Sequence, residues 1–133
     1  MQMKNMRILA TILIADTFGS DPVTAQGSRD VTGYFSRNYP ACITYGEAHN
    51  TVAIPQNECD ARELRAQDAR LNAAYRAVIV RLPFVRRADL RTDERKWILA
   101  RDHKCGKLPD PDLTTECKIN ETIKRTAYLR HYK

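Results

Sequence analysis

Two charged residues, Asp68 and Arg101, occupy predicted apolar helix faces, where a charge needs a partner. Asp68 follows Leu64 by four residues and precedes Leu71 by three, so helical geometry places its carboxylate beside the leucines. Arg101 lies four residues after Trp97 on the next expected helix. A carboxylate and a guanidinium can form two parallel hydrogen bonds, whereas breaking a buried pair costs about 3–5 kcal/mol. We predict that Asp68 and Arg101 pair and fix the register of two helices, which is a structural rather than a catalytic role.

The four cysteines, Cys42, Cys59, Cys105 and Cys117, form an even set that an oxidising compartment would pair. Zinc binding is the alternative, but sixteen residues separate the first two cysteines, eleven separate the last two, and there is no Cys-x-x-Cys motif. Two disulfides can connect four cysteines in three ways. Pairing Cys42 with Cys59 and Cys105 with Cys117 is favoured, because each bond closes a loop that contains turn-forming residues. We expect no metal site.

The remaining candidates for chemistry are the three histidines. His49 lies in an expected loop, His103 at an expected helix end and His131 near the C-terminus. The sequence suggests no Ser/His/Asp or Cys/His arrangement, and it has neither a phosphate-binding glycine loop nor a His-Glu-x-x-His motif. Asp102 precedes His103, but neighbouring positions on a helix point about 100° apart. The sequence therefore predicts a protein that is not an enzyme, with no catalytic residue and no cofactor.

Helices must position these residues, and the longest predicted one covers residues 58–82. Asn57 is a good N-cap for this helix. Pro83 should end it, because proline lacks a backbone donor and disfavours helical geometry in the preceding residue. The apolar residues of this helix recur at spacings of three, four and seven: Leu64, Leu71, Tyr75, Val78 and Leu82.

Two further helices are predicted, over residues 86–103 and 115–130. Asp112 or Thr114 can cap the second of these. Trp97, the only tryptophan, is expected to anchor the core rather than to stack on a ligand, because an indole supplies a large apolar area. One face of the first helix collects Leu90, Glu94, Trp97, Ile98 and Arg101.

The rest of the chain reads as a short helical segment and loops. Residues 31–45 carry several aromatic side chains and predict a helical turn or two, pinned by Cys42. Residues 46–56 and 107–112 lack periodicity and predict loops. Strand signals are nearly absent, since no run alternates for the length that a sheet needs. The fold class predicted is all-α, a small bundle of about three main helices plus a short N-terminal helical segment, stapled by two disulfides.

Residues 1–25 have the pattern of a signal peptide, with a positive start at Lys4 and Arg7, a short apolar run and small residues before a cleavage site. The alternative is a buried N-terminal helix of the mature fold. We expect the mature domain to comprise residues 26–133, to be periplasmic or secreted, and to contain no transmembrane segment, because the apolar run is too short to span a bilayer.

A net charge of +6 bears on the choice of partner. In an exported protein the anionic partner would be an envelope polymer or a lipid headgroup rather than nucleic acid. The alternative is that the charges are solvated faces of amphipathic helices, since lysines and arginines are spread through the whole chain. With 133 residues and 43% apolar residues, one globular domain with a modest core is expected.

Several motifs stand in a specific order between Cys42 and Leu129: Cys59, then QDARLNAAY at 67–75, then WILARDHKC at 97–105, then Cys117 with Thr122 and Arg125. In this order and spacing the chain resembles the lysozyme inhibitor LprI-like family, small exported helical domains also described as a domain of unknown function. The resemblance implies an exported, disulfide-stapled α-helical domain. It makes six residues the family's signature positions: Asp68, Asn72, Tyr75, Trp97, Arg101 and Asp102.

The resemblance also implies that the domain binds or inhibits a peptidoglycan-cleaving enzyme such as a lysozyme. The candidate contact loops are residues 46–56 and 107–112, because loops held between helices and disulfides lose little entropy on binding. Host-type lysozymes are themselves basic, so their inhibitor would gain from acidic groups at the contact. The alternative function is a structural or adaptor module that binds an anionic cell-envelope component through its arginines.

Overall fold

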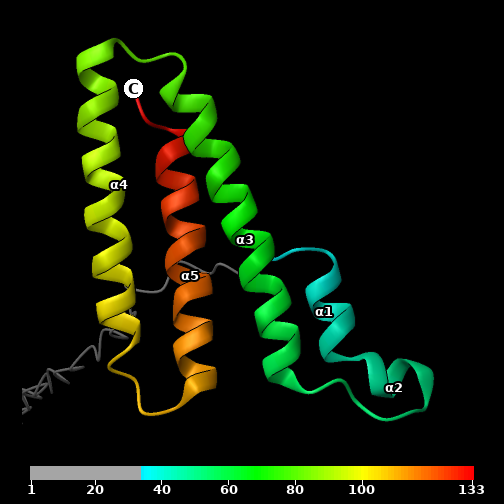
Figure 1. Ribbon diagram of the computed structural model, residues 1–133. Coiled ribbons are helices and arrows are strands. Elements are labelled where there is room, and N and C mark those ends of the chain that lie inside the picture. The colour runs from blue at the N-terminus through cyan, green and yellow to red at the C-terminus, as the bar shows by residue number, and fades with distance from the viewer. Residues whose placement is uncertain (1–33) are drawn as a thin grey trace, which may run out of the picture.

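The computed structural model describes residues 34–133, and the regular elements in that range are all helices (Figure 1). They are α1 (Asn38–Ile43), α2 (Tyr45–His49), α3 (Gln56–Ile79), α4 (Phe84–Cys105) and α5 (Pro111–Arg130). The predicted all-α fold, with three long helices and a short N-terminal helical part, is confirmed. The expected signal peptide, residues 1–25, lies outside the described residues. Within the described part of the chain, no helix combines the length and the apolar character needed to cross a membrane.

Helix α5 lies between α3 and α4 and packs against both of them (Figure 1). Its contact with α3 is the more extensive. Helices α3 and α4 therefore both pack on α5 rather than mainly on each other. The physical reason is the long buried face of α5, whose members recur at spacings of three and four: Ile119, Thr122, Ile123, Thr126 and Leu129.

The apolar core sits toward the turn that joins α3 to α4, where the three long helices converge. Trp97 is half-buried and packs against this core, which agrees with the anchoring role predicted for it. Tyr75 is also half-buried beside it. The buried members of the core come from all three helices and the turn: Leu71, Val78, Leu82, Leu90 and Leu129.

Two helix ends differ from the predictions. Asn57 does not cap α3, which begins at Gln56 directly after Pro55 and has no side-chain cap. The same helix ends at Ile79, three residues short of the predicted Leu82. The run of β-branched residues from Val78 to Val80 explains the early end, because branched side chains lose rotamer freedom in a helix.

Prolines mark the starts of the other long helices. Pro83 immediately precedes α4 and Pro111 is the first residue of α5, positions at which a missing backbone donor costs nothing. The carboxylate of Asp110 caps α5 by accepting a hydrogen bond from the backbone N–H of Asp112, at 2.8 Å. The helix thus starts four residues before the predicted Thr115, and neither of the expected caps is used.

The segment predicted as a loop over residues 46–56 contains a short helix. Tyr45 and His49 stack one helical turn apart, with ring centroids separated by 4.1 Å, and support α2. Asn50 then adopts the left-handed conformation and ends it. Gly46 is buried because the returning chain crosses it, and a Cβ there would lie 2.7 Å from the backbone of Ala53.

Both predicted disulfides are confirmed. Cys42 pairs with Cys59 and ties α1 to α3, with Cα atoms 5.7 Å apart. Cys105 pairs with Cys117 and ties the end of α4 to α5, with Cα atoms 5.6 Å apart. Because each bond crosses a connection between helices, the disulfides fix the two loop regions at the end of the bundle opposite the α3–α4 turn (Figure 1).

Candidate functional site

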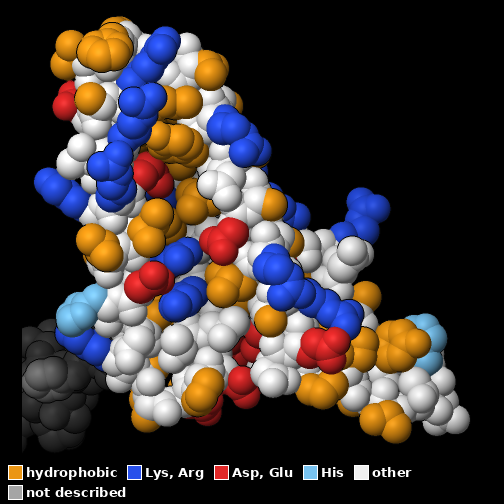
Figure 2. Space-filling model, viewed as in Figure 1, with side chains coloured by type: hydrophobic (Ala, Val, Ile, Leu, Met, Phe, Trp, Pro, Cys, Tyr) orange, Lys and Arg blue, Asp and Glu red, His pale blue; other side chains and the backbone are white. Residues whose placement is uncertain are grey.

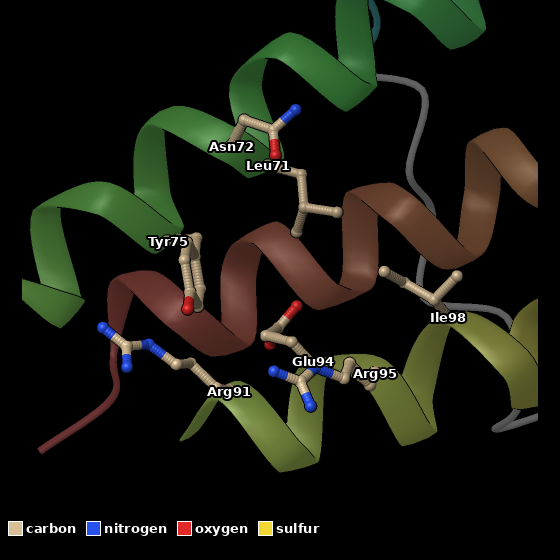
Figure 3. Close-up of a pocket in the computed structure, with 7 residues that line it drawn as sticks. All are labelled: Leu71, Asn72, Tyr75, Arg91, Glu94, Arg95 and Ile98. Atoms are coloured by element: carbon tan, nitrogen blue, oxygen red, sulfur yellow. The ribbon is translucent and has the colours of Figure 1, made fainter. Parts of the chain in front are cut away.

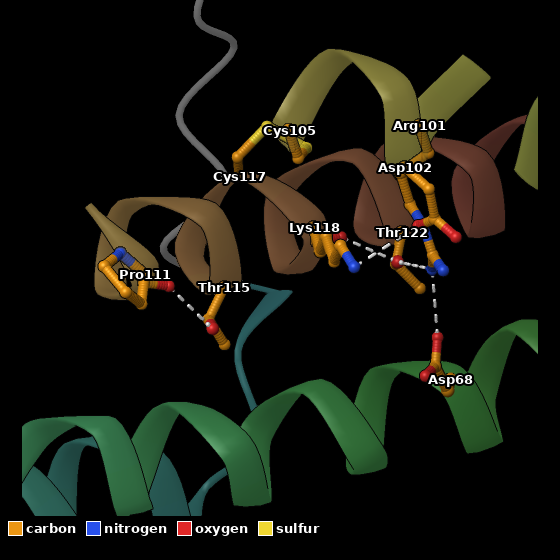
Figure 4. Close-up of polar contacts among 9 residues, drawn as sticks. All are labelled: Asp68, Arg101, Asp102, Cys105, Pro111, Thr115, Cys117, Lys118 and Thr122. Carbon is orange, nitrogen blue, oxygen red and sulfur yellow. Dashed lines mark hydrogen bonds and ion pairs between the residues drawn. A yellow bond between two sulfur atoms is a disulfide. The ribbon is translucent and has the colours of Figure 1, made fainter. Parts of the chain in front are cut away.

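Arg101 joins the three long helices at a polar junction (Figure 4). Its Nη1 lies 3.3 Å from Asp68 Oδ1 on α3 and 3.0 Å from Thr122 Oγ1 on α5. Its Nε donates to Asp102 Oδ1, at 3.1 Å. The predicted pairing of Asp68 with Arg101 is confirmed, but it rests on one hydrogen bond rather than two, and α5 supplies a third member that the sequence reasoning missed.

The two partners of this ion pair are buried to different extents. The side chain of Arg101 is 12% exposed, whereas that of Asp68 is 44% exposed. The guanidinium also lies 5.2 Å from the centre of the Trp97 ring. Arg101 is therefore the buried hub, and Asp68 is one of several groups around it.

This difference in burial predicts unequal effects of alanine substitution. Arg101→Ala should lower the free energy of unfolding by about 2–3 kcal/mol, because it removes a charged group bonded to three others. Asp68→Ala should cost less than about 1 kcal/mol, because solvent screens a half-exposed pair. Urea denaturation of both variants checks this. Equal losses for the two variants would contradict the hub role of Arg101.

A second buried cation, Arg125, links α5 to α4. Its guanidinium contacts Asp93 and Glu94, and its Nε lies 2.7 Å from Glu94 Oε1. Burial alone would lower the pKa of Arg125, but the hydrogen bonds and charges of the two carboxylates outweigh it and raise the pKa. Helical spacing predicted that Glu94 lies on the same face as Trp97, and the structure shows that its partner is Arg125.

Three polar side chains of α3 form a buried strip: Asp60, Glu63 and Gln67. Glu63 accepts hydrogen bonds from the backbone N–H of Ser36, at 2.9 Å, and from the hydroxyl of the same residue. The amide of Gln67 donates to the carbonyl of Tyr34, at 3.0 Å, and to Glu63. These residues hold the N-terminal segment on α3. Sequence reasoning missed the strip, although its spacing of three and four was the available signal.

Tyr39 completes this docking by donating from its hydroxyl to Asp60 Oδ1, at 2.7 Å. Burial, and then the hydrogen bond to Asp60 and its charge, raise the pKa of Tyr39 well above the ordinary value near 10. The fold thus favours the neutral phenol of Tyr39. The stability that this phenol contributes is fully present below its ordinary pKa, near 10, and is lost as the pH rises from there toward the pKa of the folded state.

Tyr39→Phe tests that pH dependence. Near pH 8 the variant should be less stable than the parent chain, by about 1 kcal/mol, because it lacks the hydrogen bond. Between about pH 9 and pH 11 the gap should shrink by about 1 kcal/mol, since ionisation of Tyr39 in the unfolded chain removes the parent's advantage. Urea denaturation at several pH values measures it. A gap that does not change with pH would exclude the raised pKa.

A groove lies on the face where α3 and α4 diverge, with α5 running between them (Figure 3). Its volume is about 320 Å³. The lining residues from α3 are Leu71, Asn72 and Tyr75, and those from α4 are Arg91, Glu94, Arg95 and Ile98. Four of these polar side chains form no hydrogen bond with another residue between 34 and 133: Asn72, Tyr75, Arg91 and Arg95.

The end of the bundle opposite the α3–α4 turn, which we call the loop end, consists of residues 50–55 and 106–110. Gln56 and Glu116 connect its two parts through a hydrogen bond of 2.9 Å. The side chain of Val52 is 86% exposed there. The apolar side chains exposed at or beside this end are Val52, Leu108 and Leu113, and nearby carboxylates are Glu47, Asp110 and Asp112.

Comparison with known proteins finds one matching family model. The family model of the lysozyme inhibitor LprI matches residues 44–129, which include all of α2 to α4 and nearly all of α5. The chain belongs to the lysozyme inhibitor LprI family. No curated protein and no solved structure is similar enough to the chain to count as a match.

Within this LprI-family chain, the six positions that the resemblance predicted as signatures lie in three places. Asp68, Arg101 and Asp102 meet at the polar junction, to which Lys118 adds an ion pair 3.6 Å from Asp102 (Figure 4). Asn72 and Tyr75 line the groove (Figure 3). Trp97 packs against the core. Four of the six positions therefore contribute to the packing of the helices, and the other two line an exposed groove.

The groove and the loop end of this LprI-family chain present groups that can contact a partner. The groove presents guanidinium, amide and phenol groups around an apolar floor, and the loop end presents apolar side chains with carboxylates beside them. Among the described residues, no group of three or more histidine, cysteine, aspartate or glutamate side chains is placed to hold a metal ion.

Proposed function

We propose that this chain is an exported, non-enzymatic inhibitor that binds a peptidoglycan-cleaving enzyme, such as a lysozyme, and blocks its cleft with the loop end. Membership of the LprI family supports the kind of partner. The observation that carries the choice of surface is the location of both disulfide-bordered connections at one end of the bundle (Figure 1). An exported location agrees with two disulfides in one small domain.

The loop end is already ordered before any partner binds. The disulfide between Cys42 and Cys59 closes one side, and the buried Gly46 lets the chain at Ala53 pack closely on α2. The disulfide between Cys105 and Cys117 closes the other side. A preordered surface loses little conformational entropy on association, so its contacts contribute more fully to affinity.

Charge is distributed unevenly along the bundle. Five arginines and a single acidic residue lie between Arg76 and Arg91, around the α3–α4 turn, whereas the loop end and its flanks carry Glu47, Asp110 and Asp112, and residues 50–55 and 106–110 include one cation, Lys107. The net charge of +6 therefore does not describe the loop end. Carboxylates around exposed apolar side chains are complementary to a basic enzyme and would speed its association.

A turbidity assay tests this proposal. Purified chain in molar excess should slow the clearing of a peptidoglycan suspension by at least one of several lysozyme types. Val52→Arg and Leu108→Arg should each raise the concentration needed for half-inhibition by about tenfold, because they remove apolar contact and add repulsion.

The matched control is Leu99→Arg, which introduces the same charge at a side chain of α4 that is 71% exposed. It should inhibit like the parent chain. If the parent chain slows none of the enzymes, or if the control loses inhibition as much as the loop-end variants, the proposal is wrong.

The groove supports a second candidate function, an adaptor that binds an anionic envelope polymer. Arg91 and Arg95 lie one helical turn apart on its α4 side, and neither pairs with a carboxylate of residues 34–133. Arg91→Ala and Arg95→Ala should each weaken co-sedimentation with isolated peptidoglycan, and added salt should weaken it for the parent chain. Lys96→Ala is the control, since it removes a charge from the same helix outside the groove. Salt-insensitive sedimentation would count against this function.

A further inference from the structure

The turn between α3 and α4 exposes three large apolar side chains that neither the groove nor the loop end uses. Val80 is 70% exposed, Phe84 is 82% exposed and Val85 is 69% exposed. They lie at the extremity of the bundle, where Figure 2 shows hydrophobic side chains gathered beside lysine and arginine side chains. We call this region the apolar tip. Exposing three such neighbours to water is unfavourable unless something covers them.

Cations surround the apolar tip. Arg81 directly follows Val80 and Arg86 directly follows Val85, and the only acidic residue between Arg76 and Arg91 is Asp89. The C-terminal residues lie at the same end (Figure 1). Arg130 and Lys133 are two further cations there. Two hydrogen bonds from the tip arginines hold the C-terminal residues: Arg81 donates to the backbone oxygen of Tyr132, and Arg86 donates to that of Lys133, at 2.9 Å.

We propose that the apolar tip inserts into the surface of a bilayer that contains anionic lipid. Phe84 and the two valines would enter the boundary between headgroups and acyl chains, while the guanidinium groups of Arg81 and Arg86 remain among the phosphates. A polybasic surface gains affinity for a membrane from each cation near anionic headgroups. The tip offers both contributions in one continuous region of the chain.

Two other occupants fit the tip less well. A second copy of the chain would bring the arginines around each tip together, and like charges at an interface oppose association. A protein with an apolar pocket would need an acidic rim to match the same arginines. A lipid surface supplies the apolar layer and the negative charge together without any specific complementary shape.

This inference does not rest on the proposed inhibitor function. The apolar tip and the loop end lie at opposite ends of the long helices (Figure 1). A chain docked through its tip would keep the loop end free to bind an enzyme, so the two activities can be lost separately.

Vesicle co-sedimentation with the chain as purified after export tests the inference. The chain should bind vesicles of equal parts phosphatidylglycerol and phosphatidylcholine at low salt, and should bind phosphatidylcholine vesicles at least tenfold more weakly. Phe84→Ser should weaken binding about tenfold or more. Arg81→Ala and Arg86→Ala should each weaken it about fivefold. Raising the salt concentration should weaken binding of the parent chain.

Leu99→Ser and Lys96→Ala are the matched controls, because they make the same kinds of change on α4 away from the turn. Both should bind the anionic vesicles like the parent chain, and circular dichroism should show that every variant is folded. Three results would overturn the inference: no binding to anionic vesicles, equal binding to both kinds of vesicle, or unchanged binding by Phe84→Ser. So would sedimentation equilibrium that shows a dimer abolished by Phe84→Ser, which would assign the tip to a second copy.

Discussion

Replacing both Cys105 and Cys117 with serine should lower the free energy of unfolding by about 3 kcal/mol, more than a hundredfold in the folding equilibrium. The bond spans 12 residues and joins the end of α4 to α5, the helix on which both other long helices pack. Without it, the unfolded chain regains loop entropy and the fold loses a covalent link in its central part. Urea denaturation of the oxidised parent chain and the variant measures the difference.

The matched comparison is the removal of Cys42 and Cys59, whose bond spans a similar 17 residues. This bond ties only the N-terminal segment to α3, so its loss should release that segment while leaving the packing of the three long helices in place. Hydrogen exchange should then lose protection in α1 and α2 alone. If both double variants destabilise the long helices equally, the N-terminal segment belongs to the same cooperative unit.

Leu90→Ala should lower the free energy of unfolding by about 3 kcal/mol, within the range of 2–5 kcal/mol found for buried leucines. Leu90 is fully buried, with 0% of its surface exposed, in the cluster where α3, α4 and α5 converge. Truncation removes apolar contact and leaves a cavity that a bundle closed by the neighbouring turn cannot easily fill. For a domain of this size, the thermal midpoint should fall by more than 10 °C.

Leu99→Ala provides the control, because the same substitution on the same helix affects a side chain that is 71% exposed. Its cost should stay within about 0.5 kcal/mol. Thermal and urea denaturation of the two variants should therefore separate clearly. Comparable losses at both positions would contradict the placement of Leu90 in the core and of Leu99 on the surface.

Local patterns in the sequence predicted much of this structure. The periodicity of apolar residues predicted the three long helices, and turn residues between cysteines predicted both disulfides. Helical spacing alone brought Asp68 and Arg101 together, because both are about fifteen residues from the turn that reverses the chain. These features depend on interactions between residues close in sequence or symmetric about one turn, so a single chain is enough to find them.

The missed features depend on packing that local patterns do not encode. Periodicity shows that α5 has an apolar face but not that it lies between the other helices. The buried strip that includes Glu63 reads as polar and therefore as exposed, because its partners lie in a segment about thirty residues earlier. The three long helices begin earlier than predicted, because Pro55, Pro83 and Asp110 determine where they start more strongly than the residues that we expected to do so.

The groove was equally hard to foresee from sequence. Asn72 was singled out only by family resemblance, Tyr75 was otherwise predicted only as part of an apolar helix face, and Arg91 and Arg95 read as ordinary exposed charges of an amphipathic helix. Their association depends on the angle at which α3 and α4 diverge over α5 (Figure 3). That angle is a property of the assembled bundle.

The central position of α5 also sets an order for folding. The helix follows α3 and α4 along the chain, yet each of them packs mainly against it. A chain that emerges from a ribosome or a translocation pore with its N-terminal end first would therefore expose two long amphipathic helices that lack their common partner. Cooperative collapse must wait for the residues of α5, so the domain remains unfolded until nearly all of it has emerged. We therefore expect the bond between Cys105 and Cys117 to form after the bond between Cys42 and Cys59.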